Sequence, residues 1–581
     1  MSISNTTVFS RKFKPFFFNT QIPRLIFAPF IKWPSQISYA YWQNLLKSHL
    51  WFIGSNHRMH RQKPSKSCSF EKIQSKNEGI HNETKVIINQ LKTSKPTNDK
   101  GIQLELITVF KLFWERKHIS QHIEKAIPDF RDQDLIIYSK QSIIMSALAI
   151  FLFRMGSGNK FDDKSHDEDE KYSRINMAKF IDAPEDRVPV IKTIEKFLKN
   201  LEEKSTNDLM IAFFQDLLQS KFFQQHPQIM PGDFFLLAAD CVHTHTYDHP
   251  HHTDIQGNND CGCCLKRVYH RGTEQEKVRW LHNTLVFSFV FMGGLKIPIY
   301  RYPIHAKQII NFESASEESH KQECELVALK IALPIIKEAF SRMKIVLLLD
   351  GLYANRPVIQ LAQEHKCGYI IVRKEACLPS LAKTCDEHAL TSNHRKNCTK
   401  RLQIDSKGWL IEQKYAWFNN MYLGDGLSTH ILRFLETRTN GKKIESYKCE
   451  WLFSWRLSSK SCESAARQAR ARWEEEDLFN SLKNRGFKLK HDYSRDPRSC
   501  FNWQGLAMFA FGIFELFRFS EAVKQRVDLP QITLAEKLGS QLLFRPTEEI
   551  FPVGCLLKRI QFRYHFIIEM LLFHEIALNT S

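Results

Sequence analysis

The chain has 581 residues, of which 43% are hydrophobic and 25% charged, and its formal net charge is +19. This length allows two or three domains with a sizeable core, and the composition is typical of a globular protein rather than a disordered one. The longest strongly apolar run, Ser142 to Phe153, is too short to cross a bilayer. The positive charge favours a polyanion as partner, nucleic acid above all, and we expect no membrane association.

The positive charge is concentrated at the start of the chain. Residues 1–100 contain 16 Lys and Arg against 4 Asp and Glu. The same segment is rich in Ser and Asn and shows no sustained apolar period, so we interpret it as a flexible basic arm. The 14 Cys form no regular framework, and no secretory signal precedes them. We therefore expect reduced thiols in a cytoplasmic protein.

Residues 101–230 are predicted to be a helical region. Apolar residues recur at helical spacing from Ile102 onward, and Gln141 to Phe153 has the composition of a buried helix. Two further amphipathic helices are predicted at Val190–Leu201 and Asp208–Phe223.

Residues 231–374 change to an α/β pattern. Compact apolar runs separated by turn signals predict strands at Phe234–Ala239, Leu285–Met292, Leu295–Tyr302, Ile345–Leu349 and Gly368–Arg373. Helices are predicted at Cys324–Met343 and Asn355–Lys366. Strands alternating with helices, together with a Gly293-Gly294 hairpin, predict a mixed sheet flanked by helices.

The remainder of the chain divides into three parts. Residues 375–455 alternate aromatic and polar positions and are predicted to be a β-rich insertion. Residues 456–520 return to helices, at Cys462–Asn484 and Trp503–Phe519. Residues 521–581 contain apolar stretches to which we assign no structure.

Three acidic residues are the candidate site. Asp240 and Asp350 each follow an apolar strand, where an α/β sheet presents its functional groups. On a helix, Arg472, Glu476 and Lys483 share one stripe at i, i+4 and i+11. Alone, each Asp is more often a loop cap, and the stripe more often a solvated face. Taken together, three carboxylates suit two Mg²⁺ or Mn²⁺ ions, and the two cations suit DNA phosphates.

The chain resembles the DDE transposases of bacterial insertion sequences, of the IS-four type, over residues 105–520. The segments that carry the resemblance are Ala238 to Asp240, Leu349 to Asn355, Tyr369 to Val372 and the helix Arg-Trp-x-x-Glu-x-x-Phe-x-x-Leu-Lys that begins at Arg472. The resemblance implies a ribonuclease H-like core interrupted by a β-rich insertion. It also implies a homodimer that binds element ends and target DNA in the bacterial nucleoid.

In that family two Asp and one Glu bind the catalytic metals, which implies this role for Asp240, Asp350 and Glu476. The family's Tyr-Arg-Glu-Lys signature places its last three members at Arg472, Glu476 and Lys483, and its Tyr at Ala469. The implied activity is metal-dependent DNA strand cleavage followed by strand transfer. The missing Tyr leaves open the alternative of a catalytically inactive, transposase-derived DNA-binding protein.

A second group of possible metal ligands lies between residues 241 and 270. Its Cys and His density suggests a structural zinc site, for which Cys261, Cys263, Cys264 and His270 are the candidates. The Cys-x-Cys-Cys spacing is not that of a standard zinc finger, so an unstructured polar loop is an equal alternative.

Overall fold

A computed structural model describes residues 105–551, apart from residues 168, 171, 185–186, 251–261, 306–316, 391–396, 442 and 521–529. The chain divides into two units, residues 1–89 with 577–581 and residues 90–576, and every described residue belongs to the second. The predicted basic arm, Cys261 and most of the unassigned tail therefore lie outside the described residues.

Helices make up the first part of the described chain. They are α3 (Leu106–Arg116), α4 (Ile119–Ala126), α5 (Lys140–Leu152), α6 (Gly158–Ser165), α7 (Ser173–Phe180), α8 (Ile191–Asn200), α9 (Lys204–Gln219) and α10 (Phe222–Gln225). Helix α5 is buried from Ser142 to Leu152, and the Ser139 hydroxyl accepts a hydrogen bond from the Ser142 N–H at its start.

The central sheet begins with six strands, β1 (Phe235–Tyr247), β2 (Leu265–Tyr269), β3 (Lys277–Val290), β4 (Lys296–Pro303), β5 (Ile345–Leu349) and β6 (Gly368–Val372). Strand β3 pairs antiparallel with β1 on one side and β4 on the other. Strands β1, β5 and β6 pair in parallel. The resulting order β4-β3-β1-β5-β6, with one hairpin meander followed by parallel crossovers, is the ribonuclease H-like arrangement.

The insertion extends this sheet. It consists of helix α13 (Pro379–Ala389) and strands β7 (Cys398–Ile404), β8 (Leu410–Gly424), β9 (Leu427–Asn440) and β10 (Lys443–Phe453). Strand β10 pairs antiparallel with β6, so that the described strands form one ten-stranded sheet. The expected β-rich segment thus continues the sheet edge and carries a helix that its sequence pattern did not predict.

Among the described residues, five further helices flank the sheet: α11 (Glu317–Ala339), α12 (Arg356–Glu364), α14 (Cys462–Arg470), α15 (Trp473–Asn484) and α16 (Pro497–Phe519). Helices α18 (Gln531–Phe544) and α19 (Thr547–Ile550) follow, and α18 packs against α3 and α7. Alternate strand residues serve two cores, because successive side chains point to opposite faces. Leu237 and Leu347 belong to the large core with α11, α12 and α16. Leu236 and Leu348 belong to a smaller core closed by α14. The predicted α/β class, a mixed sheet flanked by helices, is confirmed.

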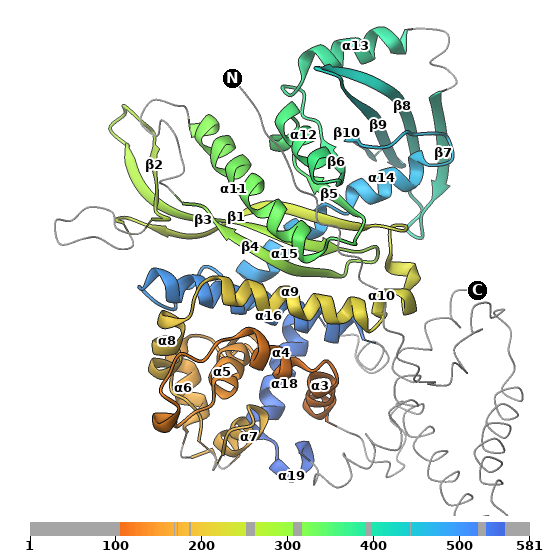
Figure 1. Ribbon diagram of the computed structural model, residues 1–581. Coiled ribbons are helices and arrows are strands. Elements are labelled where there is room, and N and C mark those ends of the chain that lie inside the picture. The colour runs from red at the N-terminus through yellow and green to blue at the C-terminus, as the bar shows by residue number, and fades with distance from the viewer. Residues whose placement is uncertain are drawn as a thin grey trace, which may run out of the picture. The chain divides into compact units, whose positions relative to one another are not determined.

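Helix α16 joins the sheet to the first helices. It packs on β4, α5, α8 and α9, and Figure 1 shows α9 and α16 side by side beneath β4. A Cβ on Gly505 would lie 2.3 Å from the Thr206 Oγ1, so glycine permits this close approach. Among the described residues, α16 alone has the length and apolar composition of a membrane span, and its apolar stretch is buried within the protein.

Several predicted boundaries are wrong. Strand β3 begins at Lys277 rather than Leu285, and α16 begins at Pro497 rather than Trp503. Strand β1 does not end at Ala239 but runs on to Tyr247, because β3 pairs with it along the whole length. The predicted helix Cys462–Asn484 divides into α14 and α15 at Ala471 and Arg472, although Arg472 keeps helical backbone angles (φ −56°, ψ −31°).

Candidate active site

Asp240 and Asp350 occupy neighbouring positions on two parallel strands. The register of β1 and β5 pairs Ala239 with Leu349, and each Asp is the next residue along its chain. Both side chains follow the alternation of the smaller-core residues Leu236 and Leu348, so they project from the sheet face that α14 covers. Strand pairing thus brings together two carboxylates that are 110 residues apart in the sequence.

Each of the two carboxylates accepts a hydrogen bond from the backbone N–H of the next residue, and Asp350 also pairs with a lysine. The Cys241 N–H donates to the Asp240 Oδ1 at 2.8 Å, and the Gly351 N–H donates to the Asp350 Oδ1 at 2.6 Å. The Lys374 Nζ lies 3.2 Å from the Asp350 Oδ2. The Lys374 side chain crosses Gly351 so closely that a Cβ there would lie 2.6 Å from the Lys374 Cγ.

These contacts decide the charge of Asp350. Burial alone would raise the pKa of its carboxyl, but the Gly351 N–H and the Lys374 ammonium outweigh burial. The nearby Arg472 guanidinium acts in the same direction, so the pKa of Asp350 lies below its ordinary value. Asp350 is therefore ionised at neutral pH, as a ligand for a hard cation must be.

Arg472 lies at the centre of the three predicted metal ligands. Its guanidinium is 3.9 Å from the Asp240 Oδ2 and forms a short ion pair with the Glu476 Oε1 one helical turn away. Burial alone would lower the pKa of Arg472. The carboxylates of Glu476, Asp350 and Asp240 outweigh burial and raise that pKa. One guanidinium is thus within electrostatic reach of all three acids.

Helix α15 contains four consecutive acidic residues, Glu474 to Asp477, whose side chains have different partners and different exposure. Glu474 and Asp477 both pair with the buried Lys296 of β4, and the Glu474 contact is 3.0 Å. Glu475 is fully buried and its Oε1 accepts a hydrogen bond from the Ser288 hydroxyl at 3.2 Å. These three residues anchor α15 on the sheet, whereas the Glu476 side chain is 57% exposed beside Arg472.

Lys483 lies in the last turn of α15, on the same side as Asp240. Burial, helped by the neighbouring Lys490, lowers the pKa of the Lys483 ammonium, and Asp240 opposes that shift. Lys483 and Lys490 in turn act electrostatically on His243 of β1. The structure therefore places a group of cations, Lys483 and Lys490 among them, beside the carboxylates.

The donor set fits a hard divalent cation. Three carboxylates, from β1, the residue after β5 and α15, lie within electrostatic reach of Arg472, and oxygen is the only kind of donor they offer. In a site of this composition Arg472 supplies positive charge that Mg²⁺ or Mn²⁺ would otherwise supply. Asp240, Asp350 and Glu476 are the residues that would hold such ions.

The predicted zinc ligands that the structure describes, Cys263, Cys264 and His270, do not gather in one place. Cys263 and Cys264 are buried just before β2, whereas His270 is exposed beyond its far end. A strand advances about 3.3 Å per residue, so six residues separate Cys264 from His270 by roughly 20 Å. His270 is therefore not positioned to share an ion with Cys264, and the predicted ligand set is wrong in this respect.

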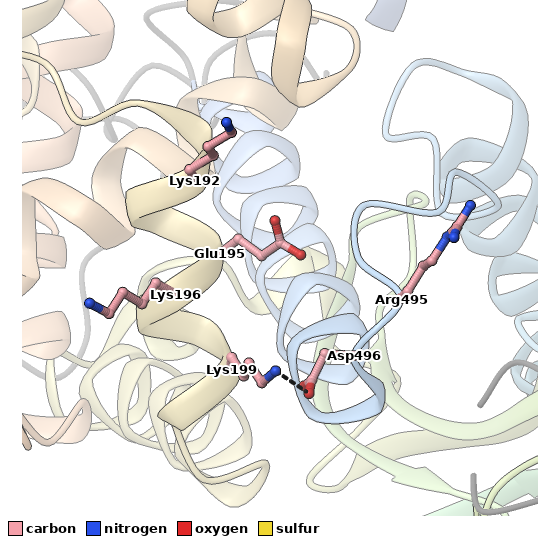
Figure 2. A pocket seen from close by; sticks show the side chains of 6 residues that line it. All are labelled: Lys192, Glu195, Lys196, Lys199, Arg495 and Asp496. Carbon is pink, nitrogen blue, oxygen red and sulfur yellow. Dashed lines mark ion pairs between the residues drawn. The ribbon is translucent and has the colours of Figure 1, made fainter. Parts of the chain in front are cut away.

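A basic hollow of about 450 Å³ lies away from the carboxylates, between α8 and the chain that enters α16 (Figure 2). Its lining residues are Lys192, Glu195, Lys196, Lys199, Arg495 and Asp496. Figure 2 shows the Lys199 ammonium directed toward Asp496, at 3.5 Å. Four cations against two carboxylates make this surface suitable for phosphate groups, but it contains none of the residues of the predicted site.

Sequence analysis did not identify Lys374, Glu475 and Lys296 as parts of the site. The Arg373-Lys374 dipeptide directly after β6 was a usable signal for Lys374, because the carboxyl ends of parallel strands meet at one edge. The sequence also contained a signal for Glu475, because it lies three, four and seven residues before Leu478, Phe479 and Leu482, which form the buried face of α15. The rotation of α15 on the sheet thus gives Glu475 a different role from its acidic neighbours.

No protein-family model matches the sequence, and a search of curated proteins finds no match. Among solved structures, the chain is similar to a piggyBac transposase in a synaptic complex with hairpin DNA, determined by cryo-electron microscopy. The TM-score is 0.32 and the identity 11%, over 84% of this chain and 89% of that one. The strand order described above, rather than this distant likeness, defines the ribonuclease H-like arrangement.

Proposed function

We propose that the protein is a DNA transposase of the DDE type, which binds the ends of its element and catalyses metal-dependent strand cleavage and transfer. The observation that carries this proposal is the gathering of Asp240, Asp350 and Glu476 around one guanidinium on a ribonuclease H-like sheet. Bound Mg²⁺ or Mn²⁺ would activate the attacking oxygen and stabilise the leaving oxygen of a phosphodiester.

The chain's own residues would position the DNA. Arg472 can exchange its carboxylate partners for phosphate oxygens, which accept charge-assisted hydrogen bonds from a guanidinium. Lys483 and Lys490 would hold the neighbouring phosphates of the same strand. In cleavage, a water oxygen bonds to phosphorus at the element end and the 3′-oxygen leaves. In transfer, the freed 3′-hydroxyl loses its proton and its oxygen bonds to a phosphorus of target DNA, while the bond from that phosphorus to the target 3′-oxygen breaks and leaves a target 3′-hydroxyl.

Two element ends must be joined to one target, so we propose that two copies of the chain act together on DNA. The net charge of +19 supports DNA as the partner. A transposase of this type would work in the bacterial cytoplasm, at the nucleoid.

The second candidate is a transposase-derived protein that binds DNA without cutting it. One observation favours it, because the signature position of an aromatic DNA contact is Ala469, which is buried and cannot reach a nucleotide. Both candidates predict binding to the inverted repeats that flank the coding frame. They differ in whether any phosphodiester is broken.

Nicking of a supercoiled plasmid that carries those flanking repeats separates the candidates. We expect nicks at the repeat ends with Mg²⁺, none with a chelator, and none from Asp240→Asn or Asp350→Asn, which should still bind the repeats. Binding without nicking by the unaltered protein, in either Mg²⁺ or Mn²⁺, would establish the inactive alternative.

A further inference from the structure

We propose that His245, Cys264, His282 and Cys500 form a structural zinc site behind the catalytic sheet. Strand pairing aligns the first three. His245 of β1 lies opposite His282 of β3. The β2–β3 register pairs Leu265 with Leu281, which places Cys264 opposite His282 on the other side. Cys500 comes from the first turns of α16.

Three of the four side chains form a compact group, Cys264 contacts one of them, and all four are shielded from solvent. His245, His282 and Cys500 each offer a ligand atom within 4.8 Å of those of the other two. The Cys264 Sγ lies 3.0 Å from the His282 Nε2. The exposed fraction is 5% for His245 and 2% or less for the other three.

Hydrogen bonds fix which nitrogen of His245 faces the group. The His245 Nε2 lies 3.1 Å from the His491 carbonyl oxygen, which can only accept, so Nε2 carries the proton. The Nδ1 lone pair is then available as a ligand. This is the arrangement of metal-binding histidines, whose second ring nitrogen donates to a backbone carbonyl.

Gln504, one turn after Cys500, contacts two of the proposed ligands. Its Nε2 lies 3.5 Å from the His245 Nδ1 and 3.7 Å from the Cys500 Sγ. One amide group that reaches both atoms shows that they face a common point. In a metal site the same amide would donate to the Cys500 thiolate.

The donor set and spacing match zinc. Tetrahedral zinc with bonds of about 2.3 Å to sulfur and 2.0 to 2.1 Å to nitrogen separates its ligand atoms by about 3.3 to 3.8 Å. The Cys264–His282 distance of 3.0 Å is slightly shorter than this range, and the other three ligand atoms lie within 4.8 Å of one another, so side-chain movements would complete the site. Two thiolates and two imidazoles leave no open position, which is typical of a structural rather than a catalytic zinc.

The site would fasten the strand that carries Asp240. His245 lies five residues beyond Asp240, after a β-bulge between His243 and His245 where the pairing with β3 shifts. A zinc ion bound there would tie this irregular end of β1 to β2, β3 and α16. Its expected effect is therefore on stability and on the position of Asp240, not on the chemistry at phosphorus.

The test measures zinc in the full-length protein, purified without chelator from zinc-supplemented cells. We expect one zinc per chain, and Co²⁺ in its place should give the visible absorption of tetrahedral cobalt with thiolate ligands. Cys264→Ser combined with Cys500→Ser should lose the zinc and the cobalt spectrum, and its melting temperature should no longer rise on addition of Zn²⁺.

The neighbouring Cys263 provides the matched control. It is equally buried, but its Sγ lies 3.3 Å from the His305 Nδ1. Cys263→Ser should keep one zinc per chain and the cobalt spectrum. The proposal is overturned if the unaltered protein contains no zinc and fails to bind Co²⁺. It is also overturned if Cys263→Ser loses the metal while the double variant keeps it. Because the readout is metal content and melting temperature, it is independent of DNA cleavage.

Discussion

The residues Glu474 to Asp477 show how side chains of the same charge acquire different roles. Burial, and secondly the charge of Asp240, raise the pKa of Glu475 well above its ordinary value of 4.5. Glu475 is therefore expected to be protonated and neutral where it packs against Ser288. Glu476, at the exposed side of the same turn, keeps an ion pair with Arg472.

The buried carboxyl predicts a pH-dependent stability. The folded protein retains the Glu475 proton that the unfolded chain releases above about pH 4.5, so this group makes stability fall as the pH rises toward its folded pKa. Glu475→Gln removes the ionisable group while keeping shape and hydrogen bonding. Its melting temperature, relative to the unaltered protein, should therefore increase between about pH 5 and about pH 8. A difference that stays constant over this range would contradict a protonated Glu475.

The two predicted phosphate-binding cations should affect DNA binding rather than metal binding. Arg472→Ala and Lys483→Ala are expected to weaken binding to the flanking repeats, and each should lower the salt dependence by about one phosphate contact. Lys460→Ala, on the loop before α14, is a control that should leave binding unchanged. Fluorescence anisotropy at several salt concentrations measures both quantities. Unchanged salt dependence in both variants would exclude phosphate contacts by these side chains.

Helix α15 is held on the sheet by the ion pairs of Glu474 and Asp477 with the buried Lys296, which we call the anchor. The Lys296 side chain is only 3% exposed and its two carboxylate partners, Glu474 and Asp477, hold the helix against β4. This contact fixes the rotation of α15 and thereby the direction of Glu476.

Removing the carboxylates of the anchor should lower the unfolding free energy more than removing its lysine. Glu474→Ala with Asp477→Ala leaves the buried ammonium without these partners and should cost about 3 kcal/mol of unfolding free energy. Lys296→Met should cost less, because the two carboxylates that remain are each about a third exposed and can be hydrated. Urea unfolding measures both. A smaller loss for the double alanine variant than for Lys296→Met would contradict the anchor.

At the scale of elements, the positions of strands were predicted more accurately than the residues at which they end. The bounds of β5 follow directly from an apolar run that stops at a charged residue, and those of β6 nearly so. Strand β1 was placed correctly at its start but not at its end, because the alternating His and Thr after Asp240 are held in the strand by pairing with β3. Val242, the two Thr and Tyr247 favour a strand, so this alternation was a usable local signal that the prediction did not follow.

In the site, too, some residues could be predicted from local sequence and others could not. Asp240, Asp350 and Glu476 were predicted from strand ends and a helical stripe, and the structure brings them around Arg472. The proposed zinc ligands were missed, apart from Cys264, since His245, His282 and Cys500 are spread over 256 residues and meet only through the folding of β3 and α16.

The whole molecule combines its early and late helices into one core beneath the sheet. Helices α3 and α7 pack against α18, and the Ile107 N–H donates to the Gln541 side chain at 3.0 Å. The predicted helical region at 101–230 therefore shares its core with helices that follow the catalytic segments. The charged arm at residues 1–100 lies outside the described residues, and its role stays a prediction from sequence.

That role can be measured by deleting residues 1–100, which carry 16 of the 82 Lys and Arg. Because arm cations should bind phosphates without reading bases, deletion should lower affinity for unrelated DNA and flatten its salt dependence. Selectivity for the flanking repeats over unrelated DNA should be retained or increase. An identical salt slope with and without the arm would exclude DNA binding by this segment.

The central claim, that Glu476 completes a three-carboxylate metal site for phosphodiester chemistry, is tested most directly by comparing two neighbours. Glu476→Gln removes the charge that would bind metal, whereas Glu475→Gln replaces a side chain that is already neutral. We expect Mg²⁺-dependent cleavage at the repeat ends to fall by about three orders of magnitude in Glu476→Gln and to change little in Glu475→Gln, with repeat binding preserved in both. Equal cleavage by both variants, or a greater loss in Glu475→Gln, would contradict the assignment of Glu476 to the metal.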